Sequence, residues 1–77
     1  MCRSIHTLYN VDPPVTGEEI RAASLQFVRK ISGYRKPSKV NEAAFIAAVG
    51  EIEAASVKLL STLTTGAPER LRESKVI

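Results

Sequence analysis

Two residues near the start of the chain, Cys2 and His6, are the only thiol and the only imidazole among 77 residues. They stand four positions apart, so a helix would place them on one face. A thiolate beside an imidazole is the minimum set for nucleophilic catalysis, and both groups also bind metals. Because no third orienting residue and no oxyanion site accompany them, a structural or incidental role is the leading interpretation. Cys2 is the candidate reactive thiol, and a thiol-dependent enzyme or redox protein is one functional hypothesis.

Other patterns of catalysis or cofactor binding are missing from the sequence. A single cysteine excludes an internal disulfide framework and a zinc site built on several thiolates. The sequence has no glycine-rich phosphate loop, and Glu18 and Glu19 are explained by a position at the start of a helix. We therefore expect no catalytic residues, no metal and no cofactor, and a non-enzyme is the better interpretation.

Positive charge is concentrated in one part of the chain. The net charge is only +3, yet the stretch from Ile20 to Asn41 holds six basic residues and no acidic one. Such a patch favours an acidic protein surface or a phosphate-bearing partner. Arg21, Leu25 and Arg29 recur every four residues on the side of a predicted helix that lies off its apolar stripe. An apolar side chain between two arginines is typical of a protein-binding face.

The hypothetical partner-binding residues extend this line into the following connector: they are Arg21, Leu25, Arg29, Lys30, Arg35, Lys36 and Lys39. An acidic protein surface is the first expectation for the partner. Tyr34 adds an aromatic ring to the basic connector, so weak nucleic-acid binding by phosphate contact and base stacking is the alternative. One tyrosine and a net charge of +3 make a small footprint for that alternative.

Two helices must position these residues, in one domain that spans 1–77. We expect a lead segment at 1–15, a first helix at 17–32, a basic connector at 33–38, a second helix at 39–64 and a frayed polar tail at 67–77. Thr16 and Glu19 have the spacing of a capping box, and Gly33 suits the left-handed position that ends helices. Ser38 or Asn41 is the predicted cap of the second helix.

Each predicted helix carries an apolar stripe that needs a partner. The first stripe comprises Ile20, Ala23, Ser24, Phe27, Val28 and Ile31, and the second comprises Phe45, Ala48, Val49, Ile52, Ser56, Leu59, Leu60 and Leu63. A short connector makes the helices fold back as an antiparallel hairpin, so the predicted fold is all-α. A short N-terminal helix or turn, through Ile5, Leu8 and Tyr9, is expected to cover the rest. Ile46 and Val57 widen the second apolar face, which leaves a monomer and a homodimer open.

The sequence also indicates where the protein resides. The first ten residues contain no long apolar run, and no stretch approaches the length of about 18 apolar residues that a membrane span requires. We therefore expect a cytoplasmic protein without a membrane partner.

Two resemblances accompany these patterns. The opening Met1-Cys2-Arg3, together with Glu19-Ile20-Arg21-Ala22-Ala23, Gln26 to Gly33, Lys36-Pro37-Ser38 and Ala67-Pro68, resembles a family of short uncharacterised bacterial proteins, a domain of unknown function. Leu8-Tyr9-Asn10-Val11, the capped start of the first helix, and Ala44-Phe45 are similar to the J-domain of Hsp70 co-chaperones. That likeness implies a hairpin whose basic first helix meets an acidic chaperone. The J-domain loop carries His-Pro-Asp, whereas this chain has Lys36-Pro37-Ser38, so stimulation of the Hsp70 ATPase is not implied.

Overall fold

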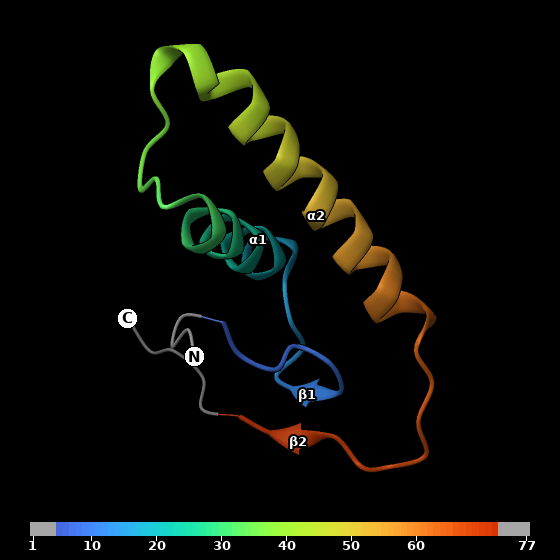
Figure 1. Cartoon of the computed structure of the whole chain (residues 1–77). Helices are drawn as coiled ribbons and strands as arrows, with labels where there is room; N and C mark the ends of the chain where they lie inside the picture. The colour runs from blue at the N-terminus through green and yellow to red at the C-terminus, as the bar shows by residue number, and fades with distance from the viewer. Residues whose placement is uncertain (1–4, 73–77) are drawn as a thin grey trace.

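Two helices dominate the computed structural model, which describes residues 5–72 (Figure 1). The described elements are, in chain order, β1 (Val11–Asp12), α1 (Gly17–Ser32), the 3-10 turn η1 (Lys39–Asn41), α2 (Glu42–Thr62) and β2 (Arg70–Leu71). The mostly helical character agrees with the expectation from the sequence. A two-stranded parallel sheet, formed by β1 and β2, is the addition to the predicted all-α fold.

Helix α1 begins and ends where local side-chain chemistry predicts. The Thr16 hydroxyl accepts a hydrogen bond from the Glu19 N–H at 3.2 Å, and the Glu19 carboxylate accepts one from the Thr16 N–H at 2.9 Å. This reciprocal pair is the predicted capping box, which satisfies N–H groups that have no partner within a helix. Gly33 has φ +79° and donates its N–H to the Arg29 carbonyl, closing α1 in the left-handed conformation.

Helix α2 is shorter than the predicted range of 39–64. Its first three predicted residues form η1, with Ser38 in the N-cap position but without a side-chain capping hydrogen bond, and the α-helix proper begins at Glu42. The Asn41 amide donates a hydrogen bond to the Ser38 hydroxyl at 3.0 Å, so the two predicted caps contact each other. The helix ends at Thr62, and Leu63 is already extended.

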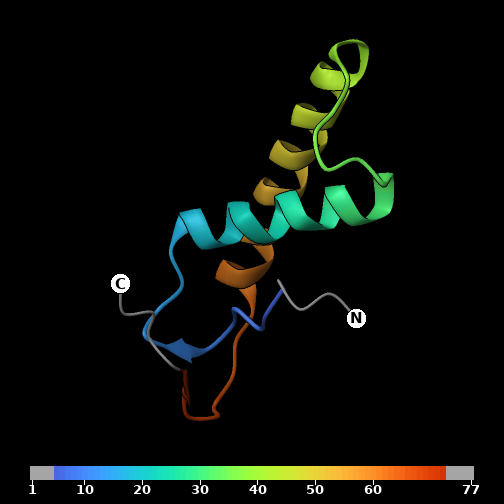
Figure 2. The same cartoon turned by 90° about the vertical axis from the view of Figure 1, so that its left-hand side faces the viewer.

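The helices pack by crossing each other, as the two perpendicular views show (Figure 2). Their shared core cluster has three buried side chains, Val28 from α1 and Phe45 and Val49 from α2. Leu25, Ala48 and Ile52 pack against this cluster and are partly buried. The core is therefore small, as expected for a chain of this length.

The crossing turns α1 relative to its predicted orientation. Phe27 and Ile31 were expected in the core, but they are 44% and 67% exposed. Leu25 was expected on the outer surface, but it packs on the core cluster. The physical reason is that α2 packs on the side of α1 that carries Leu25 and Val28, which leaves Ile31 largely exposed.

The lead segment contains no helix over its described part, residues 5–15. It runs instead into β1, which pairs in parallel with β2 from the far end of the described chain. The N–H of Arg70 donates to the Asn10 carbonyl at 2.9 Å, and the N–H of Arg72 donates to the Asp12 carbonyl at 2.8 Å. Residues 70–72, which fall in the predicted polar tail at 67–77, are thus paired with the lead segment through the N–H groups of Arg70 and Arg72.

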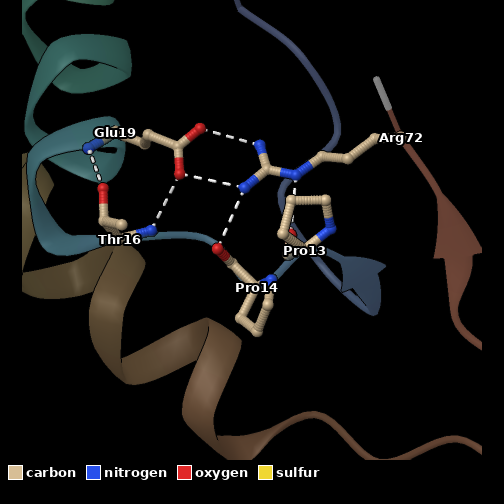
Figure 3. Close-up of polar contacts among 5 residues, drawn as sticks. All are labelled: Pro13, Pro14, Thr16, Glu19 and Arg72. Carbon is tan, nitrogen blue, oxygen red and sulfur yellow. Dashed lines mark hydrogen bonds and ion pairs between the residues drawn. The ribbon is translucent and has the colours of Figure 1, made fainter. Parts of the chain in front are cut away.

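Arg72 fastens this tail to the start of α1 (Figure 3). Its Nη1 and Nη2 donate to the two carboxylate oxygens of Glu19 at 2.7 and 3.0 Å. Its Nε donates to the Pro13 carbonyl at 2.7 Å, and Nη2 also donates to the Pro14 carbonyl at 3.0 Å. One guanidinium thus joins the end of the described chain, the lead segment and the capping box of α1. We call these contacts the Arg72 clamp.

The Arg72 clamp predicts an acid-sensitive contribution to stability. Hydrogen bonds from Arg72, and next from the Thr16 N–H, lower the pKa of Glu19 from 4.5 to about 2. Because the folded pKa is the lower one, this stabilisation is present at neutral pH and is lost as the pH falls from about 5 toward 2. Since 40% of the Glu19 side chain is exposed, solvent screening limits the effect to about 1 kcal/mol.

Thermal unfolding of Glu19→Gln, followed by circular dichroism across this pH range, measures the contribution. The variant should melt about 4–8 °C below the unsubstituted protein at pH 7, with the difference vanishing near pH 2. Glu18→Gln is the matched control, because Glu18 forms no ion pair within residues 5–72. A pH-independent difference for Glu19→Gln would contradict the electrostatic explanation.

Candidate functional site

A groove lies where the connector joins the two helices. It has a volume of about 530 Å³, and both its walls and its rim come from three consecutive parts of the chain. The residues that line it are Leu25 and Arg29 from α1, Arg35, Lys36 and Pro37 from the connector, and Glu42, Phe45 and Ile46 from α2. We call it the basic groove. Figure 2 shows the connector, in green, arching from the end of α1 to η1 at the start of the second helix.

The connector is held beside α1 by one of the predicted basic residues. Nε of Arg29 donates to the main-chain oxygen of Arg35 at 3.0 Å, which fixes the Arg29 guanidinium at the groove. Arg29, Arg35 and Lys36 form no ion pair with a carboxylate among residues 5–72. Three cations therefore line the α1 and connector sides of the groove, and none of them forms an ion pair with a carboxylate of the described residues.

The apolar part of the basic groove is partly accessible to solvent. Phe45 is buried, Leu25 is partly buried, and Ile46 is 54% exposed. An apolar floor with a charged rim is the usual anatomy of a protein-binding patch. Glu42 is the one acidic residue in the lining, at the first turn of α2, where its charge also suits the helix dipole.

Four of the seven residues that were predicted to bind a partner line the basic groove: Leu25, Arg29, Arg35 and Lys36. Lys30 and Lys39 are exposed but do not line it. Arg21 has a different setting, because its Nη1 lies 2.7 Å from the Glu53 carboxylate of α2. The stretch without acidic residues is thus not free of acids in space, and Arg21 serves as a contact between the helices.

The sequence did not predict that residues of α2 would belong to the binding site. Phe45 was placed in the core alone, and Glu42 received no role. Ile46 was recognised as an apolar residue outside the stripe of its helix, which was the available signal for this wall. Pro37 was noted as part of the Lys36-Pro37-Ser38 sequence of the connector.

The candidate chemistry of Cys2 and His6 is not assembled in the described chain. Cys2 lies outside residues 5–72. His6 is exposed and lines a second, mainly apolar groove of about 280 Å³ between the lead segment and the two helices. That groove contains no other titratable side chain, and no cluster of metal-binding residues occurs in the part of the chain that the structure describes.

Neither described helix is long and apolar enough to cross a membrane.

Comparison with known proteins gives one match, to a family model. No curated protein and no solved structure matches the chain, so these comparisons give the J-domain resemblance no support. The family model of an uncharacterised conserved protein, DUF2277, matches residues 1–76. A match over nearly the whole length shows that the chain belongs to the DUF2277 family of uncharacterised conserved proteins.

Proposed function

We propose that this protein is a non-enzymatic interaction module that binds an acidic surface of a partner protein. The observation that supports the proposal is the convergence of Arg29, Arg35 and Lys36 around an accessible apolar floor. Cations that have no contacting carboxylate attract an acidic partner from a distance and select against basic ones. The proposed contact is the basic groove rather than the whole outer face of α1, because Arg21 already pairs with Glu53.

The J-domain resemblance suggests a chaperone as the partner, which is a further proposal. A J-domain-like module would present a basic surface to an acidic chaperone, and the groove lies at the basic end of α1. The chain lacks the His-Pro-Asp tripeptide, so binding without stimulation of the chaperone ATPase is the corresponding expectation.

Charge reversal tests the proposed function. Capture from a lysate of the source cells, with proteins identified by mass spectrometry, should recover a defined acidic protein at moderate salt. Arg29→Glu combined with Arg35→Glu should reduce this recovery at least about tenfold, because both attraction and charged contacts are lost. Circular dichroism checks that the variant remains folded.

Lys58→Glu combined with Arg70→Glu is the matched control, because it changes the net charge by the same amount and both residues are exposed outside the groove. Its recovery of the partner should be nearly unchanged. Equal losses in both variants would show that net charge alone, and not the basic groove, determines binding. Recovery of nucleic acid that dissociates steeply with salt would instead favour the alternative, in which exposed Tyr34 stacks on bases beside Arg35 and Lys36.

A further inference from the structure

The basic groove offers more than positive charge, and its composition defines what kind of segment fits it. Its cations lie on the α1 and connector sides, where Arg29 is fixed by its hydrogen bond to the Arg35 carbonyl. Its apolar side is formed by Leu25, Phe45 and Ile46.

From this arrangement we infer that the basic groove binds a short acidic protein segment that carries one large apolar side chain as its anchor. The inference rests on the proposed function and specifies the partner of the same site. Carboxylates of the segment contact Arg29, Arg35 and Lys36, and the anchor lies over Phe45 against Ile46. Charge complementarity selects an acidic occupant, whereas a purely polar acidic segment would leave the apolar side in water.

Glu42 predicts the orientation of the bound segment in the basic groove. Its carboxylate belongs to the same lining and repels an acidic segment at the α2 end of the groove. The acidic residues of the occupant should therefore lie toward the connector, with the apolar anchor nearer α2. Removing this charge without changing the size of the side chain should therefore strengthen binding.

Fluorescence anisotropy with two labelled peptides tests the inference on the full chain. The first peptide has one phenylalanine with glutamates on its N-terminal side and neutral residues after it. The second has serine in place of phenylalanine. We expect the phenylalanine peptide to bind about tenfold more tightly, because it buries a large apolar side chain. Equal affinities for the two peptides would overturn the anchor while leaving an acidic partner, and with it the proposed function, intact.

Variants of the protein locate the anchor. Ile46→Ser should reduce affinity for the phenylalanine peptide severalfold and affect the serine peptide little. Val57→Ser is its matched control, since Val57 is a similarly exposed β-branched residue of α2 outside the groove. Glu42→Gln should raise affinity for both peptides about two- to fivefold. Equal effects of Ile46→Ser and Val57→Ser would overturn the placement of the anchor.

The remaining outcomes distinguish failure of the inference from failure of the proposed function. If neither peptide binds better to the unsubstituted protein than to Arg29→Glu/Arg35→Glu, recognition of acidic segments by the groove is wrong, and both proposals fall. If a peptide with phosphoserines in place of glutamates binds and the glutamate peptides do not, the occupant is a phosphorylated segment and the inference as stated is overturned.

Discussion

Alanine in place of Phe45 is expected to lower the free energy of unfolding by about 3–5 kcal/mol. Phe45 is the one aromatic ring in the core cluster, and it packs with Val28 and Val49 where the two helices cross. Removing it takes away buried apolar surface and leaves a cavity that a small core cannot easily refill. Because domains of this size have little stability to spare, much of the variant should be unfolded at room temperature.

Urea unfolding followed by circular dichroism measures this loss, and Phe27→Ala provides a matched control. Phe27 is 44% exposed, whereas Phe45 is 9% exposed, although both lie on the predicted apolar stripes. We expect Phe27→Ala to cost less than half as much as Phe45→Ala. Equal losses from the two substitutions would show that the crossing of α1 and α2 does not bury Phe45 preferentially.

The contrast between these phenylalanines shows how far local sequence patterns reach. The bounds of α1 follow from Thr16, Glu19 and Gly33, whose capping hydrogen bonds stay within four residues along the chain. The residues that face the core depend also on where α2 crosses. Periodicity identifies an apolar stripe that is wider than one partner helix can cover. It does not say which edge of that stripe packs against the partner helix. Leu25, Phe27 and Ile31 were therefore assigned to the wrong environments.

The sheet and the Arg72 clamp could not be predicted for a related reason. Strands of two residues have no alternation to detect, and β1 and β2 are separated by the whole of the helical region. Glu19 already had a sufficient local explanation as the third residue of the capping box. Its second role, as the carboxylate that binds Arg72, depends on a contact between residues 53 positions apart.

The candidate site was partly predictable because its cations are neighbours along the chain. Arg35 and Lys36 lie in the connector, and Arg29 lies in the last turn of α1, so chain connectivity alone brings them near one another. Arg21 lies two turns earlier and reaches α2, where Glu53 pairs with it. Glu42 and Ile46 could not be assigned to the groove in the same way, because their place in its lining depends on the direction in which α2 continues from η1.

Replacing Arg72 should produce the largest local effect, the opening of the sheet while the helices stay formed. In Arg72→Ala the tail loses the charged hydrogen bonds to Glu19 and those to the carbonyls of Pro13 and Pro14. What remains is chiefly the pairing of two short strands, together with hydrogen bonds from the Asn10 side-chain amide to the Ala67 and Pro68 carbonyls. Two-stranded pairing of this length is not stable alone in water.

Amide hydrogen exchange at Arg70 and at residue 72 reports this opening directly, because both N–H groups donate across the sheet. Exchange at these positions should accelerate about tenfold or more in Arg72→Ala, whereas amides in the middle of α2 should change little. Arg72→Lys should recover only part of the protection, since an ammonium keeps the charge but lacks the planar fork that contacts both carboxylate oxygens. Arg70→Ala is the control, because the Arg70 side chain makes no hydrogen bond within residues 5–72 while its N–H keeps its place in the sheet. Equal acceleration in Arg72→Ala and Arg70→Ala would mean that strand pairing, and not the guanidinium, holds the two ends of the chain together.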